Sequence, residues 1–261
     1  MLKMRLYLRA SGIFFIVAFL ASCVKDEPFI QPYSVPPTYN FENKDSSGTA
    51  RLIMMYGLKN YLSTGANAQL DSVIIDSLWI NRGAPFTESI VPNFLYTSEA
   101  INKMTSVTLA SATADVDSTM AFADSMVANS QFYNRAASNG TPGTATASQP
   151  VSVKKLFSKD GIVFDEVWFN SMLGAMAMRN IFTQLGASGT TAGPAWNLAF
   201  TFTGLPADYD PSVNYEAEPL RRNRPLGIAA YFGTEAKSAG TGPKIYEEFR
   251  RGRSAVEAGD S

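Results

Sequence analysis

Apolar residues recur at steps of three and four over much of this chain, the spacing that places side chains on one face of a helix. The first such run predicts a helix from about Thr49 to Gly65, and its inward positions are Leu52, Met55, Leu58 and Leu62. The same spacing predicts helices over about residues 70–80, 116–127 and 244–258, and a longer helix over residues 160–186.

Some details of these helices also follow from the residue types. Thr113 or Asp115 is suited to cap the third helix, and Asp160 the long one, because short polar side chains accept hydrogen bonds from the first free N–H groups. Gly174 and Ala175, within the long helix, would let a neighbouring helix approach closely.

Two apolar faces can be assigned in the same way. In the second helix the apolar positions are Leu70, Val73, Ile74 and Leu78. In the last helix they are Ile245, Phe249 and Val256. On the polar side of that last helix, Glu247 and Arg251 are one turn apart, so we expect them to form an ion pair.

Three stretches do not follow the helical pattern. Residues 136–150 are rich in Ala, Ser, Thr, Gly and Pro and predict a mobile loop, and residues 186–194 predict a second loop. Between residues 196 and 202 apolar side chains alternate with smaller or polar ones, and a period of two by itself favours a strand. Because helices dominate and no repeat of fixed period occurs, we expect an all-α fold, a helical bundle with long loops.

The N-terminus has the order of a secretory signal. A basic leader contains Lys3, Arg5 and Arg9, and the apolar run Ile13–Leu20 is too short to span a bilayer. Leu20-Ala21-Ser22-Cys23 then resembles the lipobox of bacterial lipoproteins, in which the cysteine is acylated and becomes the first mature residue. The resemblance implies lipid attachment at Cys23 and durable anchoring in a membrane.

This order divides the chain into three parts: a signal peptide over residues 1–22, a Pro-rich tether over residues 23–38, and a helical domain over residues 39–261. The tether begins Cys23-Val24-Lys25-Asp26-Glu27. A Lys and two acids at this place resemble the surface-export signal of certain Gram-negative lipoproteins. Outer-membrane anchoring facing either the cell surface or the periplasm therefore stays open.

Composition narrows the possible chemistry. The chain has no histidine and a single cysteine, which excludes internal disulfides, Ser-His-Asp and Cys-His nucleophiles, and haem or zinc sites that need imidazole. Without the leader the protein carries 19 basic and 23 acidic residues, and this slight negative charge gives no general attraction to nucleic acid. We accordingly expect no cofactor and no metal.

The remaining candidates for chemistry are carboxylates and aromatic rings. Asp165-Glu166 and Glu247-Glu248 are neighbours on helices, so their side chains diverge by about 100° and are expected to be solvated rather than to form a catalytic pair. Scattered aspartates could supply oxygen ligands to Ca²⁺, but no calcium-loop pattern accompanies them; they are Asp71, Asp76, Asp115, Asp117 and Asp124.

The tryptophans could stack on sugar rings. Trp79 and Trp168 lie within helical patterns and are expected in the core, whereas Trp196 follows a glycine-rich loop and is expected to be exposed or half-exposed.

Several stretches, taken in order, resemble a family of Gram-negative lipoproteins of unknown function related to imelysin. They are residues 35–43 (VPPTYNFEN), 47–52 (SGTARL), 173–175 (LGA) and 249–255 (FRRGRSA). The resemblance covers roughly residues 35–261 and implies an imelysin-like helical bundle. The family continues through further helices, so this chain is expected to be a shortened member whose last helix exposes apolar surface to a partner protein.

The chain departs from the family pattern at residues 193–202. The pattern there is Glu-His-x-Trp-Asp-Glu-Ala-aromatic-Gly-Tyr, and Trp196, Ala199 and Phe200 match it. Gly193 and Pro194 stand in place of the Glu and His, and Asn197 and Leu198 replace the two acids. The resemblance therefore implies that the family's polar site is degenerate in this chain.

Together these features predict a lipid-anchored helical protein of the outer membrane that is not an enzyme. Its role would be binding or scaffolding beside a protein partner, with a link to iron uptake implied by the imelysin relatives. Two alternatives remain: a peptidase or hydrolase that acts through Asp or Glu, and a surface glycan-binding protein that uses Trp196.

Overall fold

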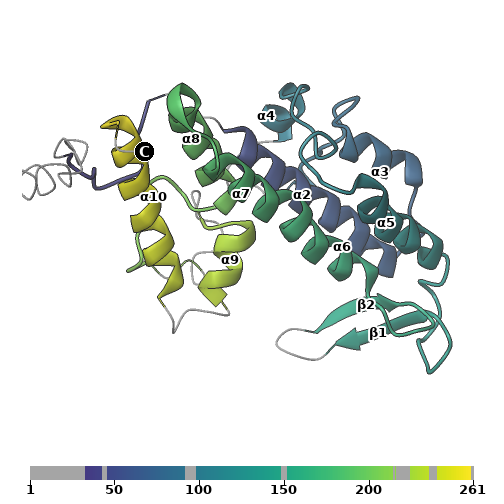
Figure 1. The fold of residues 1–261 in the computed structure, drawn as a ribbon. Helices are drawn as coiled ribbons and strands as arrows, with labels where there is room; N and C mark the ends of the chain where they lie inside the picture. Colours follow the sequence, from purple (N-terminus) through teal and green to yellow (C-terminus); the bar gives the residue numbers. More distant parts are fainter. Residues whose placement is uncertain are drawn as a thin grey trace, which may run out of the picture.

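The structure, a computed structural model, describes residues 33–42, 46–91, 98–147, 152–213, 215, 224–234 and 240–259. The leader, Cys23 and the first part of the tether lie outside these residues. The described part is mostly helical, with one small antiparallel hairpin. In Figure 1 a long central pair of helices runs through the molecule, with shorter helices at each end and the hairpin below one of them.

The first helix, α2 (Ser47–Ser63), is the buried centre of the fold. Its consecutive residues Leu52, Ile53, Met54 and Met55 are all at most 3% exposed. A helix that is apolar on several faces must be covered on several faces, and α2 indeed contacts α3, α5, α6 and α8. It ends in a 3₁₀ turn, Thr64–Ala66, so the predicted helix is confirmed.

Three helices follow α2 in the chain, and the first and third of them contact it. These are α3 (Ser72–Trp79), α4 (Ser98–Lys103) and α5 (Val116–Ser130). Asp71 caps α3 by accepting from the Val73 N–H, and Asp115 caps α5 by accepting from the Ser118 N–H. The expected inward face of α3 is wrong in part, since Val73 is 66% exposed. Ile75 is buried in place of Val73 and Ile74, whereas Leu70, Leu78 and Trp79 are buried as expected.

The predicted long helix is one continuous helical rod made of α6 (Phe164–Met172), a π-helical segment η2 (Leu173–Met178) and α7 (Arg179–Leu185). It ends at Gly186 as expected. Its N-cap is Val163 rather than Asp160, because a tight turn at residues 158–161 precedes the helix.

The expectation of a close helix approach at Gly174 is wrong, because no neighbouring atom lies within 4 Å of where its Cβ would be. The π segment has a different consequence. Widening of the helix frees carbonyl groups from the regular ladder, and the Ala175 carbonyl accepts a hydrogen bond of 2.9 Å from the Ala114 N–H. The segment therefore ties the rod to the loop before α5.

Residues 196–202 do not form a strand. They belong to α8 (Ala192–Thr203), which follows a short 3₁₀ turn, Gly189–Thr191. The alternation misled the prediction because α8 is buried along most of its length, so apolar residues are not confined to one stripe. Gly204 ends the helix at a φ of 78°, and a Cβ there would lie only 2.1 Å from the Leu226 carbonyl oxygen.

The predicted loop over residues 136–150 is also wrong in part. Residues Gly143–Ala147 form β1, which pairs antiparallel with β2 (Val153–Phe157). The Ala- and Thr-rich composition of β1 has no strand signal of its own, and the strand exists because β2 supplies the pairing partner. The hairpin projects from the N-terminal end of α6 (Figure 1).

Two helices complete the fold, α9 (Gly227–Thr234) and α10 (Thr241–Glu257). The predicted last helix is confirmed, although Arg251 pairs with Glu248 at 3.4 Å rather than with Glu247. Phe249 is 7% exposed and thus covered within the described chain, against the expectation that this helix leaves it open. No helix among the described residues combines the length and the apolar character needed to cross a membrane.

Helices α8 and α10 pack at one glycine. A Cβ built at Gly252 would lie 2.2 Å from the Cη2 atom of Trp196. The indole ring therefore rests directly on the α10 backbone, and its edge meets Phe249 with ring centroids 5.5 Å apart.

We expect Gly252→Ala to destabilise the protein by about 1–3 kcal/mol, because the added methyl group overlaps the Trp196 ring. Gly174→Ala is the matched control, another helical glycine with open space around it, and should be neutral or stabilising by about 0.5–1 kcal/mol. Urea denaturation of the three proteins measures both changes. Equal stability of Gly252→Ala and the wild type would contradict the packing described.

Candidate functional site

The strongest polar cluster in the helical part is centred on Asn197, a side chain that is 2% exposed. Its Oδ1 atom accepts hydrogen bonds from the Tyr39 hydroxyl at 3.2 Å and from the Arg253 Nε at 3.1 Å. Its Nδ2 atom donates to the Glu42 carbonyl oxygen at 2.9 Å. One amide on α8 thus joins α10 to the segment at residues 39–42. We call Tyr39, Asn197 and Arg253, with the backbone of Glu42, the amide cluster.

Arg253 carries the only side-chain charge of the amide cluster and is 8% exposed. Its guanidinium lies 4.9 Å from the centroid of the Phe41 ring and 3.9 Å from the Glu257 carboxylate. A Cβ at Gly193 would be 3.3 Å from its Nη2 atom. Gly193 has no side chain and therefore leaves the space that the guanidinium fills.

Aromatic rings enclose this cluster. The Tyr39 ring stacks on Phe200 with centroids 3.7 Å apart and planes 7° from parallel, and Phe41 meets Tyr39 edge-on at 4.9 Å. Burial raises the pKa of Tyr39, against the opposing effect of the Arg253 charge. The phenol therefore stays protonated and acts as a hydrogen-bond donor over the physiological range.

The backbone of the same segment is also held. The Tyr39 N–H donates to the Ala207 carbonyl oxygen at 2.9 Å and to the Tyr246 hydroxyl at 3.1 Å. Arg250 donates to the Pro36 carbonyl oxygen at 2.7 Å. The segment around residues 36–42 is therefore fixed by both side chains and backbone.

The residues singled out at the motif positions take structural places in α8. Asn197 is the hub of the amide cluster, while Ala199 and Phe200 are 0% and 4% exposed and belong to the core. Trp196 is half-buried, as expected, and one face of its ring is covered by Gly252. Trp79 and Trp168 are buried, which confirms their expected core positions.

A second polar cluster overturns the expectation of a solvated face at Asp165-Glu166. Glu166 Oε2 lies 2.6 Å from the Lys59 ammonium and Oε1 lies 2.5 Å from that of Lys155. Asp165 is 1% exposed, lies 3.5 Å from Lys155, and accepts a hydrogen bond from Ser63 at 2.9 Å. The two carboxylates diverge on the helix as expected, but a lysine from β2 bridges them. We call Lys59, Lys155, Asp165 and Glu166 the ion cluster.

The ion cluster joins α2, β2 and α6. Burial by itself raises the pKa of Glu166, but the hydrogen bonds and charges of Lys155 and Lys59 outweigh burial and hold it below its ordinary value. For Lys155, burial lowers the pKa, and the hydrogen bond to Glu166 with the Asp165 charge raises it above its ordinary value. Both groups are therefore charged at neutral pH, so neither is poised to take or give a proton there.

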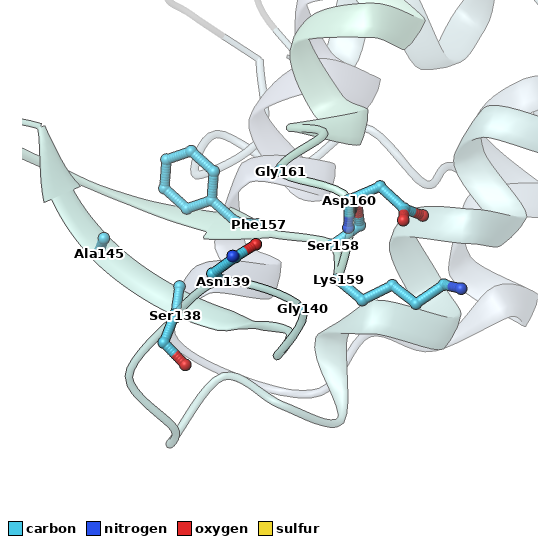
Figure 2. Close-up of a pocket in the computed structure, with 10 residues that line it drawn as sticks. Ser138, Asn139, Gly140, Ala145, Phe157, Ser158, Lys159, Asp160 and Gly161 are labelled. Atoms are coloured by element: carbon cyan, nitrogen blue, oxygen red, sulfur yellow. Dashed lines mark hydrogen bonds between the residues drawn. The ribbon is translucent and has the colours of Figure 1, made fainter.

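A hollow of about 580 Å³ lies between two turns at the hairpin, around residues 137–140 and 158–161. We call it the hairpin pocket. In Figure 2, Asn139 and Asp160 belong to the two turns, and the Phe157 ring and the Lys159 side chain extend in different directions from the same strand end. The hollow is open to solvent. Its lining combines the Phe157 ring, the Asn139 amide, the Lys159 ammonium and the Asp160 carboxylate.

The scattered aspartates do not gather. Among the described residues no three acids, cysteines or histidines are arranged to hold a metal ion. Asp71 and Asp115 instead serve as helix caps. Comparisons of the chain with protein-family models, curated proteins and solved structures find no match.

Sequence reasoning missed Tyr39 and Arg253 as members of a site. A usable signal existed, since Arg253 lies four residues after Phe249 and so shares its inward side. Tyr39 had no such signal, because its partner is 158 residues away in the chain.

We expect acid to weaken the ion cluster. Because the pKa of Glu166 is lower in the folded state than its ordinary value of 4.5, its pairing stabilises the protein above that value and is lost as the pH falls through the folded-state pKa. Glu166→Gln should therefore be less stable than the wild type at pH 7, by up to about 1 kcal/mol for a partly exposed pair, and the difference should shrink as the pH falls below 4.5.

Urea unfolding at a series of pH values measures this difference. Glu247→Gln, an exposed glutamate on α10, is the control and should follow the wild type at every pH. A constant deficit of Glu166→Gln across the whole pH range would contradict the charge pairing.

Proposed function

We propose that this protein is a lipid-anchored, mostly helical protein of the outer membrane with a non-catalytic binding or scaffolding role. Cys23 is the attachment point of the lipid, and the segment from Cys23 to Thr38 is the tether. The observation that carries the proposal is the amide cluster, because it fixes the domain end of the tether to α8 and α10. A tether held firmly at one end suits a protein that must be positioned at a membrane.

The amide cluster also supports a non-catalytic role. Asn197 stands where the imelysin-like pattern has an acid, and its amide is already bonded to three groups of its own chain. The residues quoted for the resemblance at 35–43, 193–202 and 249–255 meet around this amide. Their meeting supports an imelysin-like ancestry in which a polar site has become a structural joint, with the link to iron uptake as part of the same proposal.

The two alternatives receive less support. A hydrolase acting through carboxylates would need acids that converge on a cavity, whereas Asp165 and Glu166 bind the same lysine. A glycan-binding role loses a stacking face at Trp196, because Gly252 covers one side of that ring. The hairpin pocket, with Phe157 beside Asn139 and Asp160, is the feature that favours glycan binding, at a different place from the one expected.

We expect Cys23→Ala to release the protein from the cell envelope into the soluble fraction, because the acyl chains supply the membrane affinity. Ser22→Ala is the matched control, since it keeps a small residue before the cysteine. Fractionation of cells, together with incorporation of labelled palmitate, measures the change. Membrane retention of unlabelled Cys23→Ala protein would rule out this mode of anchoring, and protease treatment of intact cells separates a surface from a periplasmic orientation.

We expect Asn197→Leu to loosen the segment at residues 39–42. The change leaves the Arg253 Nε and the Tyr39 hydroxyl buried without their shared acceptor, at a cost of about 1–3 kcal/mol for each unpaired group. Limited proteolysis of the purified chain should then cut between residues 33 and 42 faster than in the wild type. Asn170→Ala, an exposed asparagine on α6, should leave the cleavage rate unchanged.

The same experiment can show that the amide cluster does not support the proposal. If Asn197→Leu is destabilised but the segment is cut no faster than the rest of the domain, the amide cluster is a core feature and does not fix the tether.

A further inference from the structure

An apolar cavity of about 210 Å³ lies where the end of the long rod meets α8, α9 and α10. Met178 and Ile181 form one wall, Ile228 and Ala229 from α9 form a second, and Ile245 and Phe249 from α10 form a third. The cavity is separate from the amide cluster, the ion cluster and the hairpin pocket, although Phe249 also touches Trp196 and Phe200.

The lining offers almost no hydrogen bonds. Its one hydroxyl, that of Thr203, donates to the Phe200 carbonyl oxygen at 2.6 Å and accepts from the Leu205 N–H at 3.1 Å. The cavity is partly open to solvent, so a ligand can enter it. Pockets with a mostly apolar lining and few polar groups are the usual binding sites of small apolar ligands. The chemistry of the lining therefore selects an apolar occupant over water.

The size of the cavity is that of a ligand group rather than a packing defect. Protein interiors contain few voids larger than one water molecule. At about 30 Å³ for each group of water size, the volume holds about seven such groups. A linear chain of about that many methylenes fills this space.

One residue of the lining lies next to a polar group. Gly242, near the start of α10, forms part of the lining, and a Cβ there would lie 2.9 Å from the Tyr209 hydroxyl oxygen. Burial raises the pKa of Tyr209, followed by the charges of Tyr215 and Asp210, so the phenol keeps its proton. A phenol that keeps its proton thus lies next to one lining residue of the cavity, Gly242.

We propose that this cavity binds the alkyl chain of an amphipathic small molecule, such as a medium-chain fatty acid or the end of a lipid acyl chain. The proposal goes beyond the scaffolding role and does not depend on it. A protein that failed to be lipidated at Cys23 would keep the cavity, so the two proposals fail separately.

The test uses the mature chain without its lipid, carrying Cys23→Ala, and decanoate as the probe. Isothermal titration calorimetry should show saturable binding of one decanoate per chain below its micellar concentration, and thermal unfolding should shift upward with ligand concentration. Ala229→Leu fills the cavity and should weaken binding by about tenfold or more, the effect of a misfit of a few methylene groups in an apolar pocket. Ala121→Leu, the same change on the exposed surface of α5, should bind as the wild type does.

A second variant and a vesicle experiment complete the test. If Ala229→Leu does not fold, Ile245→Phe blocks the cavity from the opposite wall and takes its place. Sedimentation with phosphatidylcholine vesicles separates a free fatty acid from a membrane lipid as the source of the chain, because only the second predicts vesicle binding that Ala229→Leu removes. The proposal is overturned if neither decanoate nor the vesicles bind saturably. It is also overturned if Ala229→Leu and Ile245→Phe bind as tightly as the wild type.

Discussion

The arrangement of the C-terminal half depends on one buried amide. The Asn197 side chain accepts two hydrogen bonds at its oxygen and donates one from its nitrogen, and these three bonds join α8, α10 and residues 39–42. A buried polar group is costly unless it is fully paired. The pairing therefore specifies which face of α10 meets α8 and where residues 39–42 lie, more strictly than apolar packing could.

The ion cluster performs the same task at the other end of the rod. Apolar contact alone would let the hairpin slide along α6, whereas Lys155 can meet Asp165 and Glu166 in only one register. Lys59 adds α2 to the same arrangement. Two polar joints at opposite ends thus fix a core whose middle is apolar side chains of α2, α6 and α8, and the apolar cavity lies at one margin of that core.

The helices could be predicted from the sequence where each had one apolar stripe. α5 and α10 follow this rule, and α2, although buried on several faces, was also located from its apolar steps of three and four. The bounds of all three agree with the expected ones to within a few residues. The rule failed at α8, because a helix covered on most sides shows no stripe. It failed again at β1, whose residues form a strand only through their partner β2. The candidate positions in α8 could be located from the resemblance, but their role as a joint could not.

The sequence by itself determined the mostly helical character, the positions of most helix ends, and the absence of imidazole chemistry, because these depend on local spacing and composition. Tertiary structure alone decided that Asp165 and Glu166 are paired rather than solvated, that Arg253 is buried, and that Trp196 lies on Gly252. Each of those outcomes needs a partner far away in the chain. Burial and charge pairing are properties of the assembled surfaces, and no local pattern contains them.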